Sequence, residues 1–374
     1  MHRAATSFLA ALLAAIAAAA PAAAADRDGV WQGMIGTLPV RACFMSRDWG
    51  DFGAYYYLSQ RKLIALEPEE GNSSAFREGD ARQAANPLWS LRTVAGDALE
   101  GQWSQGKRTL PVRLMRVAAA IGEEGPCGSL AFHGPRLEGV RTVRSRASMD
   151  GVAYTRLVLS HGGRYEASVE TFALGGAKEA DRRIDAALRE SFDGSPAAWF
   201  DCVRGALAFS PHEGSIDETQ APAFVTARWL SVKRQSDSFC GGNHPNSFIV
   251  YRTFDRRTGA ELDPLDWFDP RAVKRTSYPE TGDKEPIPTL LPALRKAVMG
   301  AWKEEGECKG VVSEQEFWNL GLGRTGFVFT PSLPRVVMAC GETFTIPYAR
   351  LARFLTPAGA REVKALQAEL ARLR

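Results

Sequence analysis

The sequence predicts an α+β protein. A β-rich N-terminal domain is followed by an α+β domain with two helices packed on an antiparallel sheet, and the chain ends in a C-terminal helix. Three observations predict this class. Residues 26–140 contain short apolar runs separated by glycine-rich turns, which is typical of strands. Residues 150–356 combine such runs with two segments of helical periodicity, and residues 357–374 repeat apolar side chains at helical spacing.

The composition is that of a folded globular protein. Of the 374 residues, 45% are hydrophobic and 24% are charged, and the net charge is +3. These values exclude a disordered or collagen-like chain. A net charge this small gives no reason to expect a nucleic-acid partner. The length fits about two domains, at roughly 150 residues for each.

Residues 1–25 have the three parts of a secretory signal peptide. Arg3 supplies the positive start, Phe8–Ala20 is an apolar run rich in Ala and Leu, and Ala23-Ala24-Ala25 provides the small residues that signal peptidase accepts. The apolar run is too short for a membrane span. We therefore expect cleavage after Ala25 and a mature protein that is periplasmic or secreted, with no membrane span.

The six cysteines predict disulfides. Their number is even, none forms a C-x-x-C pair, and an exported protein meets an oxidising compartment. Pairing within each part of the chain joins Cys43 to Cys127, Cys202 to Cys240, and Cys308 to Cys340. The alternatives are a thiolate metal site or a catalytic cysteine, with Cys240 beside His244 or His161 as the candidate thiol–imidazole pair.

Aromatic residues are dense in the first domain. The expected strands include Trp31–Gly36, Gly53–Tyr57, Arg61–Leu66 and Thr109–Val117. Tyr55 and Tyr57 share one face of their strand and Tyr56 lies on the other, so one side is expected to be core. With Trp103, Tyr55 and Tyr57 are candidates for a binding surface that stacks on sugar rings or anchors a protein.

The second domain is expected to alternate strands and helices. A helix is predicted from Lys178 to about Phe192, and a second near Leu290–Lys303. The predicted strands are Tyr154–Ser160, Tyr165–Leu174, Phe224–Val232, Ser247–Phe254, Gly326–Thr330, Arg335–Ala339 and Glu342–Ile346.

The terminal helix begins at Pro357, with Thr356 as N-cap. Its apolar side chains recur at helical spacing at Val363, Leu366, Leu370 and Leu373. Packing on the core and a short dimer seam both explain this spacing, although too few heptads are present for a coiled coil.

Several motifs in the second domain occur in a recognisable order. They are Glu170–Leu174, Cys240–Asn246, Asp255–Gly259, Leu262–Phe268, Gly326–Pro331 and Thr345–Leu351. Residues 150–356 resemble the extracytoplasmic α+β domain of RsiV-type anti-sigma factors and of some secreted peptidoglycan deacetylases. The resemblance implies a fold and an envelope ligand such as lysozyme or a cell-wall glycan, with His244 and Asn246 as candidate binding residues.

The chain also departs from that family. Asn243 replaces the usual Ala of the Gly-Gly-Ala-His segment, and Cys240 stands where an aromatic residue is common. The sequence has no transmembrane anchor, no sigma-binding segment and no deacetylase-type metal motif, so the resemblance implies neither an anti-sigma role nor an activity.

No catalytic, cofactor or metal motif emerges. The histidines His133, His161, His212 and His244 form neither H-x-H nor H-E-x-x-H, and a cluster of His244 with Asp263 and Asp266 is better explained by turns. Paired acids for glycan cleavage are available at Asp263, Asp266 and Asp269, and at Glu314 and Glu316. The segment from Asp263 also fits a turn and a short helix with Asp as cap.

Three hypotheses follow. The first is a non-enzymatic exported protein that binds lysozyme or peptidoglycan. The second is a hydrolase of envelope polymers that uses acidic residues of the second domain. The third is a periplasmic subunit of a larger assembly, held by its terminal helix.

Overall fold

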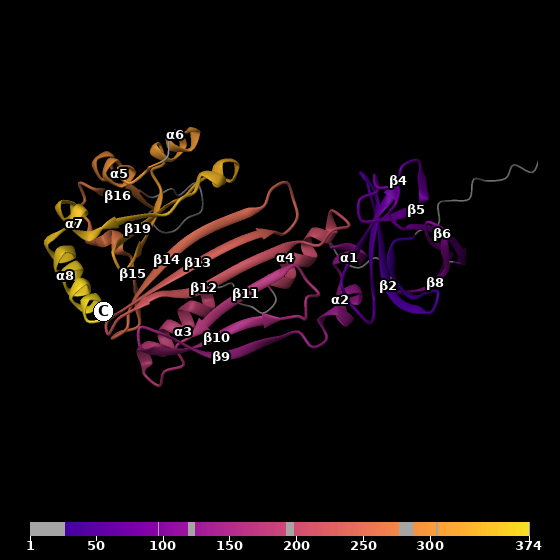
Figure 1. Cartoon of the computed structure of the whole chain (residues 1–374), viewed down its shortest axis with the longest axis horizontal. Coiled ribbons are helices and arrows are strands. Elements are labelled where there is room, and N and C mark those ends of the chain that lie inside the picture. The colour runs from indigo at the N-terminus through magenta and orange to yellow at the C-terminus, as the bar shows by residue number, and fades with distance from the viewer. Residues whose placement is uncertain are drawn as a thin grey trace, which may run out of the picture.

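The computed structural model describes residues 27–95, 97–118, 124–191, 198–276, 287–303 and 306–373. The molecule is elongated, with a barrel at one end, a long sheet in the middle and a smaller α/β layer at the other end (Figure 1). The predicted signal peptide lies outside the described residues. In the part of the chain that the structure describes, no helix is long and apolar enough to cross a membrane.

The N-terminal part is a closed barrel of eight strands in sequence order, in which the last strand pairs with the first. The neighbouring strands are antiparallel, and several are joined by short turns, such as the one at Gly36, whose φ of 59° suits glycine. The strands are β1 (Gly29–Ile35), β2 (Leu38–Arg47), β3 (Gly50–Tyr57), β4 (Ile64–Glu69), β5 (Asn72–Glu78), β6 (Leu88–Ala95), β7 (Ala98–Gln105) and β8 (Arg108–Ala118).

Aromatic side chains fill the barrel. An eight-stranded barrel is just wide enough for side chains to occupy its interior, and alternate residues of each strand point inward. The interior core includes Trp31, Tyr55, Phe76, Trp89 and Trp103. The sequence predicts strands here, but it does not predict that they close into a barrel.

A short helical junction joins the barrel to the long sheet. Helix α1 (Gly125–Gly128) carries Cys127, which forms a disulfide with Cys43 of β2. Helix α2 (Leu130–Leu137) follows, and the Tyr56 hydroxyl of β3 donates a 2.6 Å hydrogen bond to the carbonyl of Phe132. Tyr56 therefore faces the junction while Tyr55 faces the barrel interior, as the alternation of β3 predicts.

The middle of the molecule is a seven-stranded sheet in the order β15-β14-β13-β12-β11-β10-β9. The prediction of a wholly antiparallel sheet is wrong at one pair, because β11 and β12 are parallel. Parallel neighbours need a long crossover, and two helices provide it here. The elements are β9 (Arg141–Met149), β10 (Val152–Ser160), β11 (Ala167–Ala173), α3 (Glu179–Ser191), α4 (Ala198–Gly205), η1 (Ala206–Ala208), β12 (Ser215–Val225), β13 (Trp229–Phe239), β14 (Asn246–Asp255) and β15 (Ala260–Leu262).

The helix predicted from Lys178 is confirmed as α3, whereas α4 was not predicted. The single strand predicted over Phe224–Val232 is wrong. The chain turns there, and the Thr226 hydroxyl accepts a 2.8 Å hydrogen bond from the N–H of Trp229. A side-chain hydrogen bond of this kind stabilises a turn within an otherwise apolar run.

The C-terminal elements form a separate core against one face of the sheet. Consecutive strand residues face opposite sides, so Leu230 packs with α3 while Trp229 packs with the C-terminal core. The elements are η2 (Pro264–Trp267), β16 (Val273–Thr276), β17 (Ile287–Leu290), α5 (Pro292–Met299), α6 (Glu307–Ser313), β18 (Trp318–Leu322), β19 (Gly326–Pro331), η4 (Arg335–Cys340), β20 (Phe344–Pro347), α7 (Tyr348–Leu351), η5 (Ala352–Phe354) and α8 (Pro357–Ala371).

Two predictions in this region need correction. The helix expected over Leu290–Lys303 is the shorter α5, and it belongs to the C-terminal core rather than to the long sheet. The strand expected over Arg335–Ala339 is the 3₁₀ helix η4. This segment ends at Cys340, whose disulfide to Cys308 joins η4 to α6, so a tertiary constraint overrides the β propensity of its valines.

The terminal helix is confirmed. The Thr356 hydroxyl accepts a 2.9 Å hydrogen bond from the N–H of Gly359, and Pro357 is the first helical residue. Val363, Leu366 and Leu370 are buried in the C-terminal core. The apolar spacing therefore reflects core packing rather than a seam for a second chain.

Asp255 joins the sheet to the turn that contacts α8. Its carboxylate accepts hydrogen bonds from Arg257 at 2.6 Å and from Arg228 at 3.3 Å, and the Arg228 backbone N–H donates to Glu369 of α8. Burial alone would raise the pKa of Asp255. The hydrogen bonds from both arginines outweigh it and lower that pKa to about 2.

Acid is therefore expected to destabilise the protein through Asp255. A pKa below the unfolded value of about 3.9 stabilises the fold above pH 4, and this contribution of about 2 kcal/mol disappears as the pH falls towards 2. Urea unfolding of wild type and Asp255→Asn at pH 6 and pH 2.5 measures it. The variant should lose less stability in acid than wild type, and the surface variant Asp48→Asn should behave as wild type. An equal acid loss in wild type and Asp255→Asn would contradict the assignment.

Candidate functional site

The loop between β13 and β14 is the best-defined candidate site of the second domain. It begins at Cys240, which is bonded to Cys202 of α4. Gly241 and Gly242 follow with φ values of 94° and 88°, a region that favours glycine. A Cβ at Gly241 would lie 3.0 Å from the Cα of Ala206, so glycine also allows this loop to approach the end of α4 closely. The disulfide and the glycines fix where the following residues lie.

Two grooves border this loop, one lined by Pro245 and the other by Asn246. The first has a volume of about 470 Å³ and is lined by Tyr165, Ser168, Asp217, Asp237 and Pro245, among others. The second has a volume of about 340 Å³, and its lining includes Asn246, Phe248, Asn319 and Met338. Pro245 and Asn246, which are adjacent in the chain, thus line different grooves.

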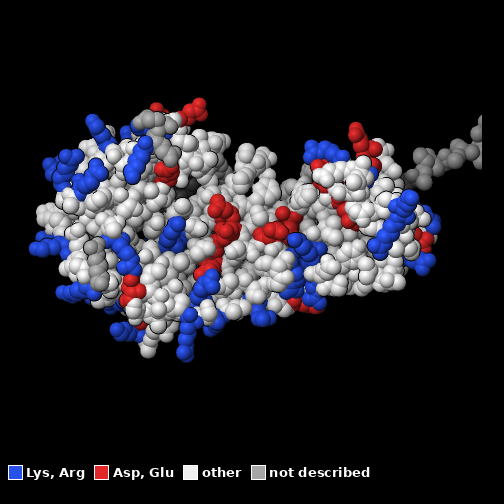
Figure 2. All heavy atoms as spheres, viewed as in Figure 1, with Lys and Arg blue, Asp and Glu red and all other residues white. Residues whose placement is uncertain are grey.

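The first groove carries an acidic pair. Asp217 of β12 and Asp237 of β13 are directly opposite each other, and both are exposed. Like charges at opposite positions of two strands repel each other. Among the described residues, no Lys, Arg or His lies within ion-pair distance of either carboxylate. Figure 2 shows acidic side chains gathered over the middle of the molecule, between its two more basic ends.

The face that bears this pair is open to solvent for a structural reason. Asp237 and Trp229 are separated by an even number of residues along β13, so they share one face of the sheet. The C-terminal core covers the Trp229 end of that face and leaves the Asp237 end free.

His244 and Asn246 lie at this loop, as the sequence predicts for neighbours in the chain. His244 is exposed, and Asn246 lines the second groove. The other site candidates, Tyr55, Tyr57 and Trp103, belong to the barrel. The structure therefore divides the five predicted residues between two separate places.

The buried histidines and the cysteines have structural roles. The His133 ring is fully buried and contacts the carbonyl of Cys127 at 3.0 Å, and burial together with the charge of Arg136 lowers its pKa well below 6.5. The His161 Nδ1 accepts from the N–H of Tyr165 at 3.3 Å. All six cysteines are in disulfides, in the pairs that proximity along the chain predicts, so the thiolate metal site and the catalytic Cys240 are wrong. Within the described ranges, no three His, Cys, Asp or Glu residues gather as metal ligands.

The acids considered for hydrolysis mostly have basic partners. Arg275 contacts both Asp263, at 2.7 Å, and Asp266, at 2.6 Å. Asp263 also caps η2 by accepting a hydrogen bond from the N–H of Leu265, as the alternative reading of this segment predicts. Asp269 pairs with Arg271, which lowers the pKa of this carboxyl to about 2 through its hydrogen bonds.

The aromatic residues of the barrel do not form the exposed surface that the sequence suggests. Tyr55 is 1% exposed and Trp103 is 7% exposed. Tyr55, Trp89 and Trp103 instead converge on Glu78, at the end of β5. Sequence analysis missed Glu78, although its position two residues after the inward-facing Phe76 places it on the same face of β5.

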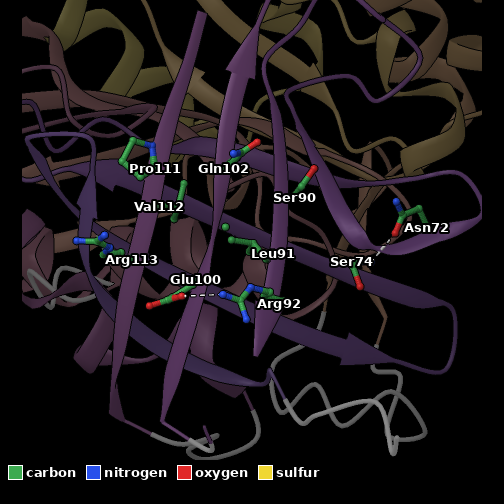
Figure 3. Close-up of a pocket in the computed structure, with 11 residues that line it drawn as sticks. Asn72, Ser74, Ser90, Leu91, Arg92, Glu100, Gln102, Pro111, Val112 and Arg113 are labelled. Carbon is green, nitrogen blue, oxygen red and sulfur yellow. Dashed lines mark hydrogen bonds and ion pairs between the residues drawn. The ribbon is translucent and has the colours of Figure 1, made fainter. Parts of the chain in front are cut away.

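A third groove lies on the outer wall of the barrel, with a volume of about 480 Å³. Figure 3 shows Arg92 and Glu100 pointing toward each other there, and they form a 3.0 Å ion pair. Gly101 belongs to its lining, and a Cβ at this position would lie 2.0 Å from the carbonyl oxygen of Ser90, so the close approach of β7 to β6 requires glycine. Arg113 also lines this groove, so its charged side chains are two arginines and one glutamate, and it suits a cationic ligand less than the acidic pair does.

Comparison with known proteins gives structural similarity only. No protein family and no curated protein matches the sequence. A crystal structure of a DUF3298 family protein from Pseudomonas aeruginosa PAO1 is similar over 59% of this chain and 96% of its own, with 14% identity and a TM-score of 0.36. A DUF3298 family member from Bacteroides fragilis is similar over 62% of this chain and 96% of its own, with 12% identity and a TM-score of 0.35.

Proposed function

We propose that this protein is an exported, non-enzymatic binding protein whose ligand is a cationic protein of the envelope space, with lysozyme as the first candidate. The observation that carries the proposal is the Asp217–Asp237 pair, which lines the groove beside the β13–β14 loop. A positively charged partner would relieve the repulsion between these carboxylates, and complementary charge favours association and specificity.

Other features support the same proposal. The three disulfides are typical of proteins from oxidising compartments, and the signal-peptide pattern of residues 1–25 agrees with export. The resemblance of residues 150–356 to RsiV-type domains implies an envelope ligand. The acidic pair favours a cationic protein over a cell-wall glycan as that ligand.

The hydrolase hypothesis has less support. Glycoside hydrolysis needs one acid that can donate a proton and a second that acts as base or nucleophile. Asp263 and Asp266 share Arg275, and Asp269 is paired with Arg271. The hydrogen bonds from Arg271 lower the pKa of Asp269 to about 2, so this carboxyl group is ionised near neutral pH and unsuited to proton donation.

The proposal predicts that removing both charges weakens lysozyme binding. Calorimetric titration of the oxidised chain, residues 26–374, with hen lysozyme should give saturable heat. Asp217→Asn/Asp237→Asn should raise the Kd by about tenfold or more, because the charge complementarity is lost while the side-chain size is kept. Asp48→Asn/Glu70→Gln makes the same change in net charge on the barrel and should retain the wild-type Kd within about twofold.

Peptidoglycan fragments are titrated alongside. Saturable heat with these fragments and none with lysozyme would show a glycan ligand and would contradict the cationic-protein proposal. Slow continuous heat from the fragments would indicate turnover and would favour the hydrolase. If Asp217→Asn/Asp237→Asn and Asp48→Asn/Glu70→Gln weaken lysozyme binding equally, the binding depends on the net charge of the protein and not on the acidic pair, which would contradict the proposal.

A further inference from the structure

The end of the barrel holds a carboxylate in an aromatic setting. One oxygen of Glu78, Oε1, accepts three hydrogen bonds: from the Tyr55 hydroxyl at 2.6 Å, from Trp103 Nε1 at 2.7 Å and from Trp89 Nε1 at 3.1 Å. The three donors come from three different strands. Burial, together with the adjacent Glu78 carboxylate, raises the pKa of Tyr55, so its hydroxyl stays protonated and donates.

The negative charge of Glu78 has no counter-ion of its own. None of the described residues places a Lys, Arg or His within ion-pair distance of it. All three donors are neutral groups, so a glutamine oxygen at this position could accept from them equally well. The aromatic donors therefore explain why an acceptor is needed here, but they do not explain why that acceptor carries a full charge.

The second oxygen of Glu78, Oε2, accepts no hydrogen bond from the described residues. The Glu78 side chain is half-buried, and Oε2 is not fully enclosed by the protein. The surroundings are also accessible, because Tyr57, Ile64 and Leu110 pack against the barrel core while remaining partly exposed. A ligand group that approaches this end of the barrel meets one free carboxylate oxygen within an apolar, aromatic rim.

The aromatic rings add to the attraction for a cation. The negative faces of aromatic rings attract cations within about 6 Å of the ring centre. The exposed Arg108 guanidinium already lies 5.8 Å from the ring centre of Trp103. The Tyr57 ring packs edge-on against Tyr55, and its hydroxyl lies 3.5 Å from the Tyr55 hydroxyl, so a further polar group is within reach of the site.

The three hydrogen bonds that Oε1 already accepts also determine which kind of cation Glu78 can bind. A guanidinium binds a carboxylate best through two parallel hydrogen bonds, one to each oxygen. Oε1 already accepts three, so only Oε2 is available. An ammonium group is a compact charge that needs one such oxygen and can place its remaining hydrogens toward water or a hydroxyl.

We propose that Glu78 and its aromatic neighbours form a binding site for a primary ammonium group, carried either by a lysine side chain or by a small free amine. This site is in the barrel and does not depend on the β13–β14 loop or on lysozyme binding. The amine-binding proposal and the lysozyme-binding proposal can therefore fail separately.

Calorimetric titration of the oxidised chain with four probes tests the proposal. Pentalysine with an acetylated N-terminus represents the peptide, and cadaverine represents the free amine. The same peptide with every Nε also acetylated has no ammonium group, and N-terminally acetylated pentaarginine carries its charges as guanidinium. At least one of the two amines should bind saturably, the fully acetylated peptide should not bind, and pentaarginine should bind more weakly than pentalysine. Glu78→Gln should weaken amine binding about tenfold or more, since it keeps the acceptor and removes the charge.

Glu70→Gln is the matched control. Glu70 is exposed at the β4–β5 turn, at the opposite end of β5 from Glu78, so its replacement changes net charge equally and should leave amine binding unchanged. Circular dichroism checks that Glu78→Gln is folded. If Glu78→Gln does not fold, Tyr57→Leu tests the proposal in its place. This variant removes only the half-buried ring and should weaken amine binding several-fold. Three outcomes would overturn the proposal. The first is that neither amine binds the wild-type protein. The second is that folded Glu78→Gln, or Tyr57→Leu if Glu78→Gln does not fold, binds the amine as tightly as wild type, and the third is that Glu70→Gln weakens amine binding as much as Glu78→Gln does.

Discussion

Replacing Arg136 by methionine is expected to lower the free energy of unfolding by about 3–5 kcal/mol, because it leaves a buried carboxylate without its partner. The Arg136 side chain is fully buried, and that of Glu213, to which it donates a 2.8 Å hydrogen bond, is 9% exposed. Arg136 also donates to the carbonyls of Arg61 and Arg164 and stacks on the Tyr165 ring at 4.2 Å. One guanidinium thus joins a barrel loop, the lead into β12 and the β10–β11 turn.

The stability that Arg136→Met loses should depend on pH. Burial raises the pKa of Glu213 even with Arg136 present, and without Arg136 that pKa should rise further. A protonated Glu213 tolerates burial, so the deficit of Arg136→Met should be largest at pH 7 and smaller at pH 5. Urea unfolding followed by circular dichroism measures both values.

Two further variants separate the buried pair from ion pairs in general. Arg156→Met removes an arginine paired with Glu170 at a more exposed position and should cost only about 0–1 kcal/mol. Adding Glu213→Leu to Arg136→Met should recover part of the loss, because no buried charge is then left unpaired. A loss for Arg136→Met no larger than for Arg156→Met would show that the buried pair has no special importance.

Removing the disulfide between Cys43 and Cys127 is expected to lower the free energy of unfolding by about 4–5 kcal/mol. The two cysteines are 84 residues apart, and a cross-link over a long loop restricts the unfolded chain strongly. Both side chains are also fully buried, in a core shared by the barrel and the junction. Thermal unfolding of Cys43→Ala/Cys127→Ala under oxidising conditions gives the measurement.

The Cys308–Cys340 disulfide is the matched comparison. Its cysteines are 32 residues apart and only partly buried, so Cys308→Ala/Cys340→Ala should cost less. The Cys43 variant should also expose the barrel to limited proteolysis separately from the long sheet. A smaller loss for the Cys43 pair than for the Cys308 pair would contradict the expected order.

Local elements were the most predictable part of this protein. Helix α3 and the capped helix α8 follow from apolar spacing and from Thr356-Pro357, since hydrogen bonds between near neighbours decide where a helix begins. The disulfide pairs could also be proposed from proximity along the chain. The β12–β13 turn was missed because it lies within an apolar run and depends on one hydroxyl, that of Thr226.

The candidate sites were only partly predictable. His244 and Asn246 are neighbours in the sequence, so a single loop brings them together. Asp217 and Asp237 meet only through the register of β12 and β13. Tyr55 and Trp103 were predicted to belong to a binding surface, but both are buried, and their role as donors to Glu78 depends on barrel closure.

The sequence by itself determined the β-rich character of the first domain, the main helices and the alternation that places Tyr55 and Tyr56 on opposite faces. These properties depend on neighbouring residues and on the period of each element. Only the tertiary structure decided that eight strands close into a barrel, that β11 and β12 run parallel, and that Glu78 and Arg136 become centres of contact. Strand pairing and burial join residues far apart in the chain, and the pattern of one strand does not specify its partner.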